Sequence, residues 1–222
     1  MSWIGANLDL IGSHLLAHLA QALPAIVLSF LLAVPIAKLI AVRGWLRTPL
    51  TAGAGLLYAV PSLPLFIVLP LVLGTSIRSP GNVVVALTIY GLALMVPSAS
   101  EALRAVPGET LRSATAQGYA PLARFLTVEL PLAGPALVAG LRVVAVSTVS
   151  LVTVGGVLGV PSLGMLFIDG FQRGIIAEIL AGVVLTAALA LLLDALIVVL
   201  ARIALPWAHQ RPARRRTTGA AA

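Results

Sequence analysis

The sequence has no cysteine, one lysine and few charged residues of either sign. Without cysteine the chain has no disulfide framework, no thiolate metal site and no cysteine nucleophile, and its redox compartment stays undetermined. The three histidines, at positions 14, 18 and 209, are too scattered to favour a metal centre. Only 9% of the 222 residues are charged, whereas 60% are hydrophobic. Because a soluble domain carries about 25% charged residues, these shortages predict a polytopic membrane protein.

Motifs for nucleotide binding and for hydrolysis are missing as well. A P-loop ends in Gly-Lys-Ser/Thr because its lysine reaches the phosphates, and Lys38 instead follows Ala37 beside an apolar run. Any ATP that drives this protein must therefore be hydrolysed by another chain. Neither Gly-x-Ser-x-Gly nor His-Glu-x-x-His occurs. We predict a protein that is not an enzyme and that uses no metal and no cofactor of its own.

The net charge of +7 does not indicate nucleic acid as a partner, because the positive charges form no basic face. Eleven of them lie in segments that we assign to the cytoplasm, against Arg78 and Arg173 in the outer loops. The positive-inside rule then predicts a multi-pass plasma-membrane protein in contact with lipid, with its N-terminus outside and its C-terminus in the cytoplasm. The first positive charge follows the first apolar run, so no cleavable signal peptide is expected. The eleven are Lys38, Arg43, Arg47, Arg104, Arg112, Arg124, Arg202, Arg211, Arg214, Arg215 and Arg216.

The apolar runs predict an all-α membrane bundle of about five transmembrane helices, since a span needs about 20 apolar residues. We expect an N-terminal outer segment at 1–14, a transmembrane domain at 15–207 and a basic, disordered cytoplasmic tail at 208–222. The five spans are predicted at 15–40, 50–73, 82–102, 132–157 and 175–205.

One long polar stretch, residues 107–131, interrupts the apolar sequence. Gly108 opens a short helical segment, Gly118 breaks it, and Pro121 can start a second helix because proline is tolerated in a first turn. Its charged residues make the stretch too polar for lipid. We therefore predict a cytoplasmic knob that docks into a partner. The charged residues are Glu109, Arg112, Arg124 and Glu129.

Prolines and serines inside the spans are candidates for a solute path. Pro61 and Ser62 lie within the second span, where a bend can present freed carbonyls and a hydroxyl to water, or can simply be a packing kink. Ser98, Ser147 and Ser150 are the other candidates, and each of them could equally pack between helices.

Arg142 and Asp194 are the two charges deep within the predicted spans, at similar depth. A charge at such a depth is costly unless it is paired. We therefore predict an intramembrane ion pair between the fourth and fifth spans, and we favour a packing clamp over a transport role.

The polar stretch resembles the cytoplasmic coupling loop of binding-protein-dependent ABC importer permeases. That motif reads Glu-Ala-Ala, three residues, Gly, eleven residues and Leu-Pro. Here Arg112-Ser113-Ala114, Gly118 and Leu130-Pro131 keep the spacing. Arg112 and Ser113 stand where the family has glutamate and alanine, so the usual glutamate contact with the ATPase is altered.

Further segments are similar to the osmoprotectant permeases for glycine betaine, carnitine, choline and proline. The segment Tyr58-Ala59-Val60-Pro61-Ser62-Leu63 carries the Pro-Ser-Leu pattern of that group. The other similar segments are residues 89–104, 128–133 and 155–159.

This resemblance implies a permease subunit that moves a compatible solute by alternating access. It would pair with a second permease, identical or paralogous, with two cytoplasmic ABC ATPases docked on the coupling loops and an extracytoplasmic binding protein that delivers solute. The ATPase contact would fall on Arg112, Ser113, Ala114, Gly118, Tyr119, Pro121, Phe125, Leu130 and Pro131.

Three other functions are compatible with the residues. The solute could be an amino acid, the protein could be an ATP-independent channel or secondary transporter, or it could be a scaffold without a solute path. Asp194 is the only deep carboxylate, which disfavours a secondary transporter coupled to ions. Aromatic residues make up only 5% of the chain, so the spans offer little of the aromatic cage that holds quaternary ammonium groups. High-affinity recognition is therefore expected in the binding protein.

Overall fold

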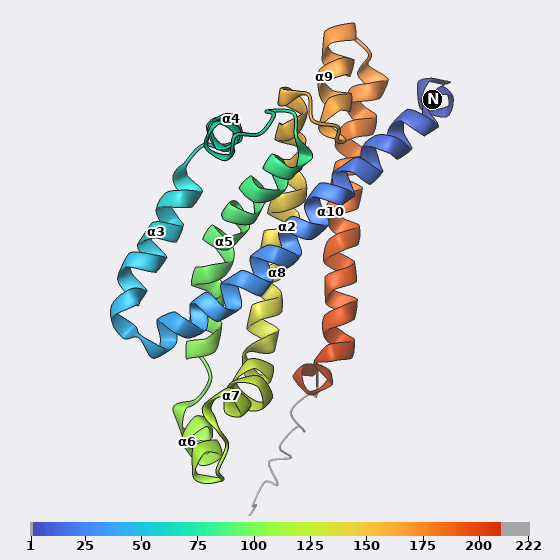
Figure 1. Ribbon diagram of the computed structural model, residues 1–222. Helices are drawn as coiled ribbons and strands as arrows, with labels where there is room; N and C mark the ends of the chain where they lie inside the picture. The colour runs from blue at the N-terminus through green and yellow to red at the C-terminus, as the bar shows by residue number, and fades with distance from the viewer. Residues whose placement is uncertain (1, 210–222) are drawn as a thin grey trace, which may run out of the picture.

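The computed structural model describes residues 2–209, and every regular element within them is helical (Figure 1). The elements in chain order are α1 (Ser2–Ala6), α2 (Leu8–Val42), η1 (Gly44–Leu46), α3 (Arg47–Ala59), α4 (Ser62–Leu73), α5 (Pro80–Arg104), α6 (Gly108–Ala116), α7 (Pro121–Arg124), η2 (Phe125–Glu129), α8 (Leu130–Gly155), η3 (Gly156–Leu158), α9 (Gly164–Arg173), α10 (Ile176–Ala204) and η4 (Pro206–His209).

Four helical segments among the described residues are long and apolar enough to cross a membrane: α2, α5, the continuous segment Pro121–Leu158, and α10. The pair Gly44–Ala59 and Ser62–Leu73, which contains α3 and α4 and bends by 105°, is long and apolar enough to make a fifth span when taken together. The bend falls at Val60 and Pro61, both in extended conformation. Proline pushes the residue before it out of the helical region, so the break follows from the sequence. The predicted all-α bundle of about five spans is confirmed, with its second span broken.

The first span begins earlier than the sequence suggested. Helix α2 starts at Leu8, so residues 8–14 belong to it and only α1 precedes it. Pro24 lies inside α2 without ending it, as membrane helices allow. The predicted outer loop at 159–174 contains a helix, α9. Of the predicted tail, residues 210–222 lie outside the described part of the chain.

The polar knob and the helix α9 lie at opposite ends of the bundle (Figure 1). At one end α6 and α7 project below the spans, beside the C-terminal end of α10. At the other end α9 packs against α10, close to α1. The two ends therefore present very different surfaces, which is what a protein with a cytoplasmic and an extracytoplasmic face requires.

Close approaches between backbones hold α5 against α2 and α8. A Cβ atom at Gly91 of α5 would lie 2.0 Å from Ser29 Oγ of α2. A Cβ at Gly140 of α8 would lie 2.2 Å from Ser98 Oγ of α5. Small residues let membrane helices pack this closely, and these contacts add to two clusters of buried apolar side chains.

Replacing Gly91 by alanine should destabilise the bundle, because the added methyl collides with Ser29. Overpacking of this kind costs about 1–3 kcal/mol. The measurement is the apparent melting temperature of the purified protein in detergent. Gly12→Ala in α2 is the matched control, since nothing lies within 4 Å of that Cβ. A melting temperature for Gly91→Ala equal to that of Gly12→Ala would contradict the close-packing argument.

Candidate functional site

The polar knob, residues 107–131, contains α6, α7 and η2 and ends in the first turn of α8. A turn at Gly118 joins α6 to α7. Gly118 has a φ of 88°, a conformation that favours glycine. The amide of Tyr119 donates to the carbonyl of Ala114 at 3.2 Å, which closes the C-terminus of α6. Ala114 is buried, so the turn is fixed by local hydrogen bonds and by one small inward-facing side chain.

The predicted coupling residues divide between two surfaces of this knob. The predicted coupling residues in α6 and in the turn after it are exposed, except for Ala114. Leu122 of α7, which follows them, is 69% exposed. Phe125 and Leu130 are half-buried and pack against the apolar core at this end of the bundle. The outer surface of the knob is thus free to dock, while its inner surface attaches it to the spans. The exposed predicted residues are Arg112, Ser113, Gly118, Tyr119 and Pro121.

An ion pair ties the knob to the first span. Lys38 Nζ of α2 lies 2.5 Å from Glu129 Oε2, whose side chain is only 3% exposed. The same ammonium lies 4.9 Å from the centroid of the Phe125 ring, within range of a cation–π contact. The single lysine of the chain therefore contacts both ends of the segment η2.

The helix α7 continues through η2 and α8 into η3 as one helical rod of 38 residues, about 57 Å long at 1.5 Å per residue. The segment η2 within it is a π-helical turn. Such turns are rare and occur frequently at functional sites. No loop therefore separates α7 from α8.

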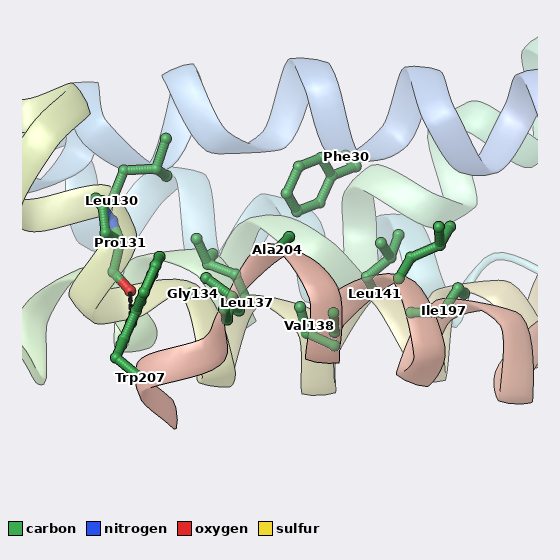
Figure 2. Close-up of a pocket in the computed structure, with 13 residues that line it drawn as sticks. Phe30, Leu130, Pro131, Gly134, Leu137, Val138, Leu141, Ile197, Ala204 and Trp207 are labelled. Carbon is green, nitrogen blue, oxygen red and sulfur yellow. Dashed lines mark hydrogen bonds between the residues drawn. The ribbon is translucent and has the colours of Figure 1, made fainter. Parts of the chain in front are cut away.

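An apolar cavity of about 440 Å³ lies between α2, α8 and α10 near the knob (Figure 2). Phe30 of α2 lies on one side of it, and Ile197 and Ala204 of α10 lie on another. At its end next to the knob, Trp207 Nε1 donates to the carbonyl of Pro131 at 3.3 Å. Pro131 of the coupling motif, in the first turn of α8, thus contacts the segment that follows the last span.

A second cavity, of about 490 Å³, gathers four of the five predicted path residues. They come from the α3–α4 break and from α8, and Tyr58 and Tyr90 line the same cavity. Ser98 is not among the lining residues, because its hydroxyl packs against Gly140 between α5 and α8. The four gathered residues are Pro61, Ser62, Ser147 and Ser150.

Arg142 and Asp194 form a two-pronged ion pair between α8 and α10. Nε lies 2.6 Å from Oδ1, and the second nitrogen, Nη2, lies 2.8 Å from Oδ2. The pair is not enclosed by this chain, since the Arg142 side chain is 45% exposed and that of Asp194 is 22% exposed. A charged pair half-way along two spans, open to the surroundings, is poorly suited to hydrocarbon. We therefore expect this face to meet water or another subunit.

The ion pair and the second cavity lie on one stripe of α8. Arg142, Val146 and Ser150 are four residues apart, which places them on one helix face, and all three are exposed. The stripe covers about 12 Å between Arg142 and Ser150 at 1.5 Å per residue. Arg142 and Ser150 therefore face the same side of the molecule.

Some residues of this arrangement were not predicted from sequence. From the sequence, Lys38 was placed in a cytoplasmic loop and Glu129 in the knob, and no contact between the two was predicted. Tyr90 was not singled out, because its partners are far away along the chain. Among the residues that the structure describes, no group of three or more His, Cys, Asp or Glu side chains is placed to hold a metal.

These features define a helical membrane transport subunit with a docking knob at one end and a polar stripe along one face. Residues 25–209 match the family described as the binding-protein-dependent transport system inner membrane component, and the chain belongs to this family. It is a permease subunit of the ABC importer type.

Two curated relatives are osmoprotectant permeases. The chain is 29% identical to the osmoprotectant import permease protein OsmW of Salmonella typhimurium over 191 residues, which cover 85% of this chain and 88% of that one. It is 28% identical to the glycine betaine/carnitine/choline transport system permease protein OpuCD of Bacillus subtilis, over 82% of this chain and 76% of that one. Among solved structures, the MetNI methionine ABC transporter in inward-facing conformations shares the fold at a TM-score of 0.77 and 21% identity, over 88% of this chain and 96% of that chain.

Replacing Lys38 by methionine should lower the melting temperature, because Glu129 is left as an unpaired buried carboxylate. The loss should be about 1–3 kcal/mol, below the value for a fully buried pair because the Lys38 side chain is 24% exposed. Adding Glu129→Gln removes the orphan charge and should recover part of the loss. Arg43→Met, at an exposed position near the same helix end, is the control. A melting temperature of the double variant below that of Lys38→Met would contradict the stabilising role of the Lys38–Glu129 ion pair.

Neutralising only one member of the Arg142–Asp194 pair should reduce the yield of folded protein. An unpaired charge within a span is costly, because it must be kept away from hydrocarbon. We expect Asp194→Asn to give less monodisperse protein in size-exclusion chromatography than the double variant Arg142→Gln/Asp194→Asn. Equal yields from the single and the double variant would show that the two charges are independent.

Proposed function

We propose that this chain is the membrane permease of an ABC importer for a compatible solute of the glycine betaine, choline or carnitine type. The observation that carries the proposal is the polar stripe of α8, which joins the predicted path residues to the Arg142–Asp194 pair. The solute class rests on the osmoprotectant relatives, which align with most of the chain. The likeness to the methionine transporter concerns the fold alone and says nothing about the solute.

The knob is proposed to receive a cytoplasmic ATPase of the ABC type. Its exposed residues Arg112, Tyr119 and Leu122 combine one charge with apolar surface, as a docking contact needs. Since Arg112 stands where the family motif has glutamate, we expect it to meet an acidic group on the ATPase. Closure of an ATPase dimer would then push on α7.

The push on α7 is proposed to reach the solute path in two ways. The continuous rod carries it into α8, where Arg142, Ser147 and Ser150 lie. The ion pair between Glu129 and Lys38 carries it into α2. Rigid helices that move together around a central path are the structural basis of alternating access, so ATP drives a change of gate and no bond chemistry in this subunit.

A second permease subunit is proposed to cover the stripe of α8. The exposed ion pair supports this, because a partner subunit or the water between two subunits would keep it from lipid. The family description supports a separate solute-binding protein. We propose that it docks at the end of the bundle that carries α9, with the knob in the cytoplasm, in keeping with the charge asymmetry of the loops.

Replacing Gly118 by leucine should uncouple the importer while leaving it assembled, because a side chain is strained at a φ of 88° and would distort the docking turn. We expect a several-fold loss of solute-stimulated ATP hydrolysis and of uptake in proteoliposomes that contain the permease, its ATPase and the binding protein.

The matched control is Gly108→Leu, at the start of α6, where the nearest atom to an added Cβ lies 3.8 Å away. Co-purification of the ATPase with both variants would establish assembly. Unchanged uptake and ATP hydrolysis in Gly118→Leu would contradict the docking role of the knob.

A further inference from the structure

The cavity of about 490 Å³ at the α3–α4 break is lined by two tyrosines that the sequence places 32 residues apart. Tyr58 lies in the last turn of α3 and is 51% exposed, whereas Tyr90 of α5 is 3% exposed. Their ring centroids lie 6.4 Å apart with an angle of 83° between the ring planes, an edge-to-face arrangement. The two rings form a corner, in which the exposed Tyr58 supplies most of the aromatic surface and the buried Tyr90 supports it.

The corner is held in place by the helix break itself. The hydroxyl of Tyr90 donates a hydrogen bond to the carbonyl of Val60, the last residue before Pro61. That carbonyl lies in the interruption between α3 and α4, where the regular helical pattern stops. Tyr90 thus satisfies a backbone group that would otherwise be costly in a membrane, and the same bond fixes its ring beside Tyr58.

The rest of the lining is neutral. The remaining lining residues are apolar except for three serines, Ser62, Ser147 and Ser150. Within residues 2–209, none of the three serine hydroxyls has a hydrogen-bond partner in the protein. No charged side chain lines the cavity. The cavity therefore combines aromatic surface, small apolar groups and free hydroxyl donors, without a counter-charge.

Because the lining carries no charge, the affinity of the cavity for a cation depends on the free energy needed to remove that cation from water. A small metal ion or a primary ammonium needs several strong ligands when it is desolvated, and a neutral cavity does not supply them. A quaternary ammonium group carries its charge behind methyl groups and is attracted to aromatic faces. A carboxylate or hydroxyl on the same solute can accept or share hydrogen bonds with the serines.

We propose that Tyr58 and Tyr90 form a transit site in the permease that receives the quaternary ammonium group of the solute, with Ser62, Ser147 and Ser150 contacting its polar end. The inference rests on the proposed function and adds to it a binding site within the membrane subunit. Its two rings provide less than a full cage, which suits a site that the solute must also leave. Arg142 lies on the same stripe of α8 and is neutralised by Asp194 of α10, so it does not repel the cation and Asp194 does not trap it.

The test is binding of choline to the permease–ATPase complex without the binding protein. The complex is placed in nanodiscs of phosphatidylethanolamine and phosphatidylglycerol, which contain no choline headgroup, and saturation-transfer NMR reports on the ligand methyl groups. The comparison ligand is 3,3-dimethyl-1-butanol, which has the same shape with carbon in place of the charged nitrogen. We expect choline to bind about tenfold more tightly than this neutral analogue.

The decisive variants differ by the ring alone. Tyr58→Leu should reduce choline binding about tenfold and abolish the preference over the neutral analogue, whereas Tyr58→Phe should retain both, because it keeps the ring. Equal binding of the two ligands to the unaltered complex would overturn the transit site. So would a Tyr58→Leu variant that binds choline as the unaltered complex does.

Uptake of glycine betaine by the full importer separates this inference from the proposed function. If the unaltered importer takes up no quaternary ammonium solute, the proposed solute class and the transit site both fail. If it takes up glycine betaine at a rate that Tyr58→Leu leaves unchanged, only the transit site fails. A several-fold slower uptake in Tyr58→Leu, with the ATPase still co-purifying, supports both.

Discussion

Hydrocarbon solvates neither charges nor free backbone groups, and this constraint explains where the polar residues of the chain lie. The knob with its charges stands outside the spans. The carbonyl freed at the α3–α4 break is taken by the Tyr90 hydroxyl. The two deep charges, Arg142 and Asp194, satisfy each other through two contacts. Both side chains remain partly exposed on the surface of this chain. This exposure is the reason for the proposal that a partner subunit or water covers that face.

The knob is joined to the fourth span without a loop, because α7, η2 and α8 form one continuous rod. Lys38 adds a lateral attachment, because it contacts Glu129 and Phe125 at the two ends of the π-helical turn. Trp207 adds another through the carbonyl of Pro131. The knob is thus attached to the first span, to the fourth span and to the segment that follows the last one.

The cavity that we propose to receive the solute lies at the bend between α3 and α4. A straight second span would have buried its backbone and left no cavity beside α8. The Pro61 break turns the chain by 105°, and the cavity beside it is lined by two rings and three serine hydroxyls as well as by aliphatic side chains. The low aromatic content had suggested that high-affinity recognition lies in the binding protein. Two of the few aromatic residues nevertheless meet in this cavity.

The sequence by itself determined the membrane class, the all-α composition, the approximate number of spans and the two helices of the knob. These properties depend on local quantities: run length, hydropathy, and the backbone preferences of glycine and proline at Gly118, Pro121 and Pro61. The tertiary structure alone decided which distant side chains meet. Lys38 and Glu129 are 91 positions apart, and their contact depends on the crossing of α2 over the start of α8. Tyr58 faces Tyr90, and Ser98 packs against Gly140 away from the cavity, because of the rotation of each helix about its axis, which hydropathy in so uniformly apolar a chain does not encode.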